Sequence, residues 1–299
     1  MVDVHLRALG RRLRAQREAA EMTQSAAARG VFLSSQTIGR LEDGMSTRMS
    51  ELHLTTLCDL YGAGMAEREE ALALLRRGRA AVVQNTDWQG LFGDLMSADD
   101  RSRMALEQHA ISMTAFGATL VPTLLQTTEY RRVVEQALHP QDSPDEIERR
   151  VRLVRARRLR TNGARAHFYM LESAVRHVIG DAAMMRDQLL ELAETRSPRI
   201  SVQLIDQHAG HNIGLHLTSF ALLEFGALVG GQPEPPEVFL DSGPWALRLD
   251  REDDLAHYRD AVAELPRTAL SKSDSRELLR EIAHGYDCMS TSSDSQAQP

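Results

Sequence analysis

Hydrogen-bonding side chains occupy one face of a short predicted helix near the start of the chain. In the stretch SSQTIGRLE, the large apolar side chains Ile38 and Leu41 fall on one face at helical spacing. This leaves Ser35, Gln36 and Arg40 on the outward face. Short or amide-bearing side chains near the start of a helix can hydrogen-bond to base edges in the major groove of DNA. The pattern therefore predicts a recognition helix.

A second short helix must hold the recognition helix in place. Thr23 is a good N-cap residue, and the alanine-rich run from Gln24 to Arg29 follows it. Ser34 can cap the recognition helix in the same way. Small alanine side chains in the first helix allow two helices to cross closely. Residues 23–44 are therefore predicted to form a helix-turn-helix.

This segment resembles the phage-repressor (XRE) class of helix-turn-helix. The matching residues, at the spacing of that class, are Thr23, Gln24, Ala28, Val31, Ile38, Leu41, Glu42 and Gly44. The resemblance implies binding to double-stranded DNA, and the alternative is a plain helical hairpin with no DNA role. The residues expected to meet DNA are Thr23, Gln24, Ser34, Ser35, Gln36, Thr37 and Arg40, with Arg14 from the preceding helix.

One position departs from the XRE pattern. The turn residue that is usually glycine is Phe32 in this chain. Glycine suits that position because φ is positive there, and a bulky side chain adopts positive φ only at a cost in free energy. Either Phe32 accepts this conformation, or Gly30, two residues earlier, reshapes the turn.

Composition and charge indicate a globular protein with a basic N-terminal segment. The chain has 299 residues, 42% hydrophobic and 26% charged, which is typical of a globular protein with room for two domains. The net charge of −7 argues mildly against DNA binding by the chain as a whole, but residues 1–48 carry eight arginines against five acidic residues. Among these, Arg7, Arg11 and Arg14 share a helix face that either meets phosphates or is simply solvated.

The sequence carries no sign of secretion or of membrane insertion. The first residues are polar and arginine-rich, without the apolar run of a signal peptide. The longest apolar stretch, 215–231, contains His216 and Glu224, which argues against a transmembrane helix. Cys58 and Cys288 are the only cysteines, and Cys58 is expected to be a buried thiol. We therefore expect a cytoplasmic protein that binds no membrane.

The helical and strand patterns predict two domains and a tail. Five helices are expected in the first domain, at 4–20, 24–29, 35–42, 52–60 and 65–78. The first domain is assigned to residues 1–80, the second to 87–285, and a disordered tail to 286–299.

The second domain is predicted to be α+β, with one sheet of about five strands. The expected strands are 166–171, 200–205, 217–225, 237–241 and 245–249. The expected helices are 97–116, 128–137, 144–160, 182–195, 252–265 and 273–284.

Over about residues 6–284 the chain resembles actinobacterial regulators of the WhiJ-like type, in which an XRE helix-turn-helix precedes a domain of unknown function. The residues that carry this resemblance are Glu107, Ala110, Val121, Pro122, Leu124, Leu125, Gln126, Thr127, Tyr130, Arg152, Arg155, Leu171, Glu172, Gln188, Leu189, Val202, Gln203, Leu204, His211, Phe220 and Tyr258. The most specific element is the block VPTLLQTTEY, in which Thr123 stands where the family usually has glycine. The resemblance implies a transcription factor of development or antibiotic production, often encoded beside a small partner protein.

The VPTLLQTTEY block is a candidate effector or partner site. Leu124 and Leu125 cannot both face the same side of a single turn, so one of them could contact a ligand. Gln126 and Tyr130 would share a face if the segment is helical. Apolar contact with a few orienting polar groups is typical of a binding groove. The equally weighted alternative is a helix cap that packs on the sheet as scaffold.

Two acidic residues are further candidates for an effector or partner site. Glu107 and Glu172 stand in predicted apolar surroundings. They could form a buried acidic pair that binds a cation or a partner, or each could be an ordinary satisfied polar group.

Neither catalysis nor a metal or other cofactor is predicted. His208, His211 and His216 do not have the spacing of metal ligands, and no cysteine accompanies them. Ser173 and Ser219 lack the context of a nucleophile elbow, and no phosphate-binding glycine motif is present.

Two hypotheses remain for the function. The first is a DNA-binding regulator, a homodimer on an inverted repeat, whose second domain responds to a signal or small partner protein. The second is an antitoxin-like module that holds a small partner protein and uses DNA binding to regulate its own operon.

Overall fold

Two units make up the computed structural model, which describes residues 3–84, 90–160, 163–231, 233–242, 245–249 and 251–294. The first unit, here called the head, comprises Met1–His109 and Phe225–Pro235. The second, the sheet domain, comprises Ala110–Glu224 and Pro236–Pro299. The division falls later in the chain than the link expected at residues 81–86. The segment Phe225–Pro235 belongs to the head although it connects two strands of the sheet.

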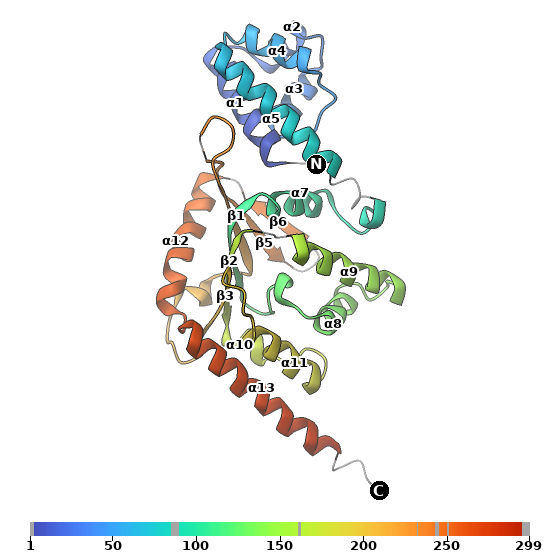
Figure 1. The fold of residues 1–299 in the computed structure, drawn as a ribbon, viewed down its shortest axis with the longest axis vertical. Coiled ribbons are helices and arrows are strands. Elements are labelled where there is room, and N and C mark those ends of the chain that lie inside the picture. Colours follow the sequence, from blue (N-terminus) through green and yellow to red (C-terminus); the bar gives the residue numbers. More distant parts are fainter. Residues whose placement is uncertain are drawn as a thin grey trace. The chain divides into compact units, whose positions relative to one another are not determined.

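The head contains the five helices that the sequence predicts, and the helix α7 lies further along the chain. They are α1 (Val4–Ala19), α2 (Gln24–Gly30), α3 (Ser35–Glu42), α4 (Glu51–Leu60), α5 (Met65–Gln84) and α7 (Ala98–Glu107) (Figure 1). A side-chain cap begins each of the first four, from Asp3, Thr23, Ser34 and Ser50 respectively. These caps satisfy N–H groups that have no partner within the helix, which is why the chain becomes helical at these points.

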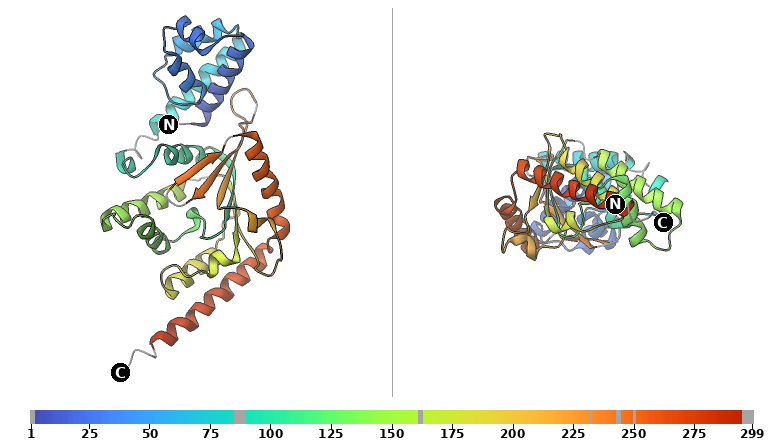
Figure 2. Two further views of the ribbon diagram at one scale, coloured as in Figure 1. Left: turned by 180° about the vertical axis from the view of Figure 1, so that it is seen from behind. Right: turned by 90° about the horizontal axis from the view of Figure 1, so that it is seen from below.

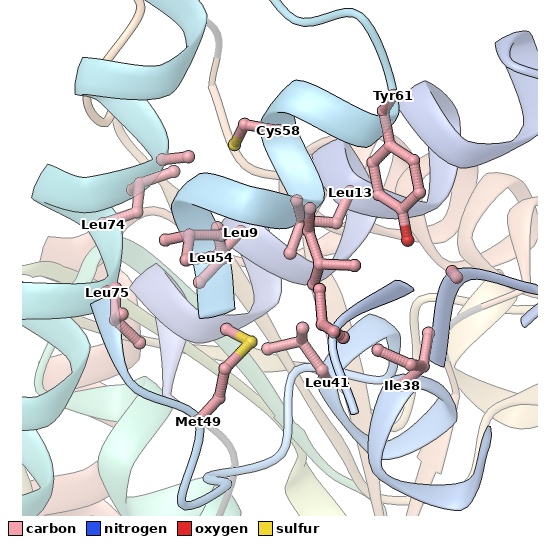
Figure 3. Close-up of a cluster of buried hydrophobic side chains, with 14 of the residues drawn as sticks. Leu9, Leu13, Ile38, Leu41, Met49, Leu54, Cys58, Tyr61, Leu74 and Leu75 are labelled. Atoms are coloured by element: carbon pink, nitrogen blue, oxygen red, sulfur yellow. The ribbon is translucent and has the colours of Figure 1, made fainter. Parts of the chain in front are cut away.

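Leucine and isoleucine side chains from four helices form the core of the head (Figure 3). Leu9 on α1, Ile38 on α3, Leu54 on α4 and Leu74 on α5 are each almost fully buried. Gly10 lets α1 and α3 approach closely, since a Cβ at Gly10 would lie 2.5 Å from the Leu41 carbonyl oxygen. The backbones of the two helices are therefore in direct contact at this crossing.

A six-stranded sheet lies at the centre of the sheet domain. Its strands are β1 (Ala110–Gly117), β2 (Arg165–Leu171), β3 (Ile200–Ile205), β4 (Phe220–Phe225), β5 (Glu237–Ser242) and β6 (Trp245–Leu249). Their order in space is β3-β2-β1-β4-β5-β6. The β1–β2 and β2–β3 pairs are parallel, whereas β4–β5 and β5–β6 are antiparallel.

Helices cover both faces of this sheet (Figures 1 and 2). The helical elements are η1 (Thr123–Leu125), α8 (Thr128–Leu138), α9 (Pro144–Arg160), α10 (Glu172–Arg176), α11 (Ala182–Ala193), η2 (Ile213–His216), α12 (Glu252–Thr268) and α13 (Lys272–Asp294). One face carries α12, where Phe220 of β4 packs on Tyr258 with ring centroids 4.8 Å apart. The other face carries α8, α9 and α11.

The predicted α+β class is confirmed, but the sheet has six strands and the helix expected at 97–116 is wrong in its second half. That helix ends at Glu107, and Ala110–Gly117 forms the strand β1. The reason is burial, since residues from Met113 to Gly117 are buried without alternation. A strand buried on both faces shows no period of two, so it cannot be told from a buried helix by pattern.

The C-terminal helix also differs from expectation. α13 continues to Asp294, past residue 286, where the sequence suggested that a disordered tail begins. Residues 295–299 of that tail lie outside the described residues.

Candidate nucleic-acid interface

The helix α3 presents the polar face that its sequence predicts. The Ser34 hydroxyl caps it by accepting a hydrogen bond from the Thr37 N–H at 3.1 Å. Ile38 is buried in the head core, while Ser35, Gln36 and Arg40 are exposed. The exposed side chains belong to one short helix with a fixed start, so α3 offers donors and acceptors in a defined geometry.

The helix α2 is tied to α3 through Gln24. Thr23 caps α2 by accepting from the Ala26 N–H at 3.2 Å. The Gln24 side-chain amide donates to the Glu42 carboxylate at 2.9 Å and lies beside Gly39. Gln24 is therefore half-buried and already bonded within the motif, whereas Thr23 is exposed.

Glu42 is the centre of a buried ionic network. Its carboxylate accepts hydrogen bonds from Arg17 Nε at 2.6 Å and Arg17 Nη2 at 3.0 Å. Burial alone would raise the pKa of Glu42, but the hydrogen bonds from Arg17 and Gln24, with the nearby charge of Arg14, hold its pKa below the ordinary value. Glu42 is thus ionised at neutral pH and fixes the end of α3 against α1.

The arginines of α1 are engaged within the head. Arg14 donates to the Asp43 carboxylate at 2.7 Å and lies 3.5 Å from Glu42. Arg11 pairs with Glu234, and Arg7 is buried with its guanidinium 5.7 Å from the Phe225 ring centroid. Phosphate binding, one of the two possibilities for these three arginines, therefore competes with internal partners, and the buried Arg7 is not on a solvated face.

Three arginines in or next to the helix-turn-helix have side chains that can contact DNA phosphates. Within the described residues, Arg29, Arg40 and Arg48 are exposed and make no ion pair or side-chain hydrogen bond. Arg29 lies near the end of α2 and Arg48 follows α3. Arg40 is among the residues predicted from the sequence to meet DNA, and Arg29 and Arg48 are not, because arginines are frequent in this region and only the absence of an internal partner distinguishes these two.

The turn between α2 and α3 keeps the geometry that glycine usually serves. Phe32 has φ 57°, and its side chain is 96% exposed. The Leu33 N–H donates to the Ala28 carbonyl at 2.9 Å, which is the 6→1 bond of a Schellman motif. Of the two possibilities that the sequence left open, Phe32 therefore accepts the left-handed conformation, and Gly30 remains within α2.

The VPTLLQTTEY block is folded back on itself. Leu124 and Leu125 are both buried, so neither is open to a neighbour. The Gln126 amide donates to the Val121 carbonyl at 2.7 Å, and the Val121 N–H donates to the Tyr130 hydroxyl at 3.4 Å. Gln126 precedes α8, whose cap is Thr127, so the two polar side chains do not share a helix face as expected.

A glutamine from α11 completes this arrangement. Gln188 is fully buried, and its amide donates to the Leu125 carbonyl at 3.0 Å while accepting from the Thr127 N–H at 2.7 Å. Burial raises the pKa of Tyr130 to about 12, so its hydroxyl stays protonated at neutral pH. These contacts favour the scaffold alternative for the block.

The two candidate acidic residues each have an arginine of their own. Glu107 pairs with Arg103 at 3.1 Å within α7 of the head. Glu172, in the sheet domain, accepts from Arg176 Nε at 2.5 Å and from the Gln207 N–H at 2.9 Å. Glu107 and Glu172 thus correspond to separately satisfied carboxylates, the second of the two possibilities that the sequence left open.

Little else in the described residues has the form of a chemical site. His211 and His216 face each other with their Nε2 atoms 2.8 Å apart, but no group of three or more potential metal ligands occurs among the described residues. Cys58 is fully buried, as expected, and burial raises the pKa of its thiol. Within the described ranges, no helix has both the length and the apolar character needed to cross a membrane.

Two known families match the chain. Residues 8–71, which include α2 and α3, match a helix-turn-helix domain family. Residues 101–281 match a family described as a domain of unknown function, DUF5753. Searches of curated proteins and of solved structures gave no match. Because the second match covers more than half of the chain, the protein belongs to the DUF5753 domain family and carries a helix-turn-helix domain at its N-terminus.

Proposed function

We propose that this chain is a sequence-specific, DNA-binding transcription regulator of the WhiJ-like, XRE type, cytoplasmic and without enzymatic activity. The observation that carries the proposal is the exposed face of α3, where Ser35, Gln36 and Arg40 stand on a helix fixed by the Arg17–Glu42 pair. A helix placed in this way can enter the major groove and read base edges with its first residues.

Unpaired positive charge beside α3 supports this proposal. Arg29, Arg40 and Arg48 are exposed arginines without an internal partner among the described residues. Each arginine that neutralises a phosphate steepens the salt dependence of binding, by a slope of about 0.9 in log K against log salt. The head can therefore bind DNA although the net charge of the whole chain is −7.

The sheet domain is proposed to receive the controlling signal. Its strands β4 and β5 are joined by the segment Phe225–Pro235, which belongs to the head unit. Within that unit, Arg12 donates to the Val229 carbonyl at 2.5 Å and to Glu70 at 2.8 Å, and Leu228 and Val229 pack on the head core. A change in β4 or β5 can thus reach α1 along the connecting segment and through these hydrogen bonds and packing contacts.

Replacement of Gln36 tests base reading. Gln36 is exposed near the start of α3, where an amide can bond bidentately to adenine. We expect Gln36→Ala to lose roughly 1–3 kcal/mol of discrimination between the preferred site and random DNA, with little change in affinity for random DNA. The measurement is fluorescence anisotropy with the full chain and with a site selected from a random-sequence pool.

A matched variant separates the recognition of bases from the attraction of DNA phosphates. Arg29→Ala removes an exposed arginine outside α3 and should weaken binding to both DNAs equally, with a shallower salt slope. If Gln36→Ala loses equal affinity for selected and random DNA, Gln36 does not recognise a base. Failure of the unmodified chain to select any sequence would contradict the proposed function itself.

We also expect two copies of the chain to bind DNA together. One helix-turn-helix buries a small interface, and proteins of this kind gain affinity by placing two copies on half-sites about one helical turn apart. We therefore propose a homodimer on an inverted repeat, with the dimer surface in the sheet domain because the head is small. Analytical ultracentrifugation should show a dimer, and a monomer both free and on the selected DNA would exclude this arrangement.

A further inference from the structure

Phe32 has a backbone conformation that raises the free energy of the folded chain and a side chain that gains no burial energy in return. Its φ of 57° lies in the left-handed region, which a bulky side chain adopts at a cost. Its side chain is 96% exposed, so an aromatic ring that would gain from burial stands in water. No other residue of the turn between α2 and α3 has positive φ among the described residues.

At 96% exposure, the Phe32 ring makes almost no contact with the head that could offset this strain. The hydrogen bonds of the turn, from the Phe32 N–H to the Arg29 carbonyl and from the Leu33 N–H to the Ala28 carbonyl, use backbone groups only. Glycine would make both bonds and would adopt the same φ without strain. The ring of Phe32 therefore contributes nothing to the stability of this turn.

Phe32 lies close to the helix α3 that is proposed to contact DNA. Phe32 lies two residues before Ser34, the N-cap of α3, so their Cα atoms are at most about 7.6 Å apart. If the first residues of α3 reach base edges, a side chain as long as phenylalanine at this position stands at the rim of the same groove. Arg29, one turn back on α2, is exposed and unpaired among the described residues.

We propose that Phe32 is a DNA-contacting residue, whose ring packs on an apolar surface of the duplex beside α3. This inference rests on the proposed function. Two groups of DNA offer such a surface at the rim of the major groove, the C5-methyl group of thymine and the carbon face of a deoxyribose. A methyl contact would make Phe32 a determinant of sequence specificity, and a sugar contact would make it a determinant of affinity alone.

The test compares stability and DNA binding in Phe32→Gly. The variant removes strain and no internal contact, and this relief should offset the greater freedom of glycine in the unfolded chain, so its melting temperature should rise or stay unchanged. Its affinity for the DNA that the unmodified chain selects should fall about tenfold, which corresponds to roughly 1.4 kcal/mol. Leu52→Ala is the matched control, since Leu52 is 72% exposed on α4 and should leave affinity unchanged.

The expected result is a loss of DNA affinity without a loss of stability. Unchanged affinity in a stable Phe32→Gly would overturn it, as would a fall in melting temperature, which would show that the ring supports the fold. If the unmodified chain binds no DNA sequence selectively, the proposed function fails and this inference fails with it.

Modified DNA then identifies the contacted group. Replacing the thymines of the selected site by uracil removes the C5-methyl groups only. If uracil weakens the unmodified chain but not Phe32→Gly, the contact is a thymine methyl group. If uracil affects the two proteins equally while Phe32→Gly remains the weaker binder, the contact is a deoxyribose.

Discussion

Glu42→Ala should destabilise the head by roughly 3–5 kcal/mol, the usual result of removing one partner of a buried ion pair. The Glu42 side chain is 1% exposed and the Arg17 side chain 11%, so the variant leaves a largely buried guanidinium without its carboxylate. Gln24 would lose its acceptor as well. Chemical denaturation followed by circular dichroism measures the change in the free energy of unfolding.

The pH dependence of stability provides a second measurement on the same group. Because the pKa of Glu42 is lowered in the folded head, its contribution is fully present above the unfolded value, near 4.5, and is lost as the pH falls through the folded value. Glu42→Gln should therefore be less stable than the unmodified chain at pH 7. Its free energy of unfolding should also fall less steeply as the pH drops below 4.5.

Asp43→Asn is the matched control for this network. Asp43 is the next residue, is 55% exposed, and pairs with Arg14 at 2.7 Å. A solvent-exposed pair contributes about 0–1 kcal/mol, so this variant should unfold nearly as the unmodified chain does. Equal effects of the Glu42 and Asp43 variants would show that burial of the Arg17–Glu42 pair does not stabilise the head.

The helices of the head could be predicted because the signals that begin them are local. Thr23 and Ser34 cap helices through bonds to residues three positions later, and this spacing is visible in the sequence. The sequence leaves two conformations open for Phe32, because sequence alone does not show whether a turn will tolerate a strained residue with positive φ. The structure answers it through the 6→1 bond between Leu33 and Ala28.

The internal partners of the candidate residues could not be predicted, because they come from distant parts of the chain. Arg14 meets Asp43, 29 residues later, and Thr127 meets Gln188, 61 residues later. Spacing along one helix suggests which side chains share a face, but it does not show what packs on that face. For the same reason the sequence predicts a helix where β1 forms, since burial on both faces of a strand depends on helices that follow it in the chain.

Replacement of Gln188 by methionine, which has a similar volume, should destabilise the sheet domain by about 2–4 kcal/mol. The reason is that the Thr127 N–H and the Leu125 carbonyl would lose their partner at a buried position, and each unsatisfied buried group costs roughly 1–3 kcal/mol. The measurement is denaturant unfolding of the full chain, read against Gln207→Met. Gln207 is an exposed glutamine, and its variant should change stability by less than about 0.5 kcal/mol.

The same experiment decides between the two interpretations of the VPTLLQTTEY block. If the block is scaffold, Gln188→Met lowers stability, and Gln126→Ala combined with Tyr130→Phe does so too, because all three side chains fix the backbone between Val121 and Thr127. A ligand or partner site predicts the reverse pattern, with normal unfolding and normal DNA binding but no response to the controlling signal. The buried positions of Gln188 and Tyr130 make a loss of stability the expected outcome, since a polar group held at zero exposure cannot meet a partner without first breaking these bonds.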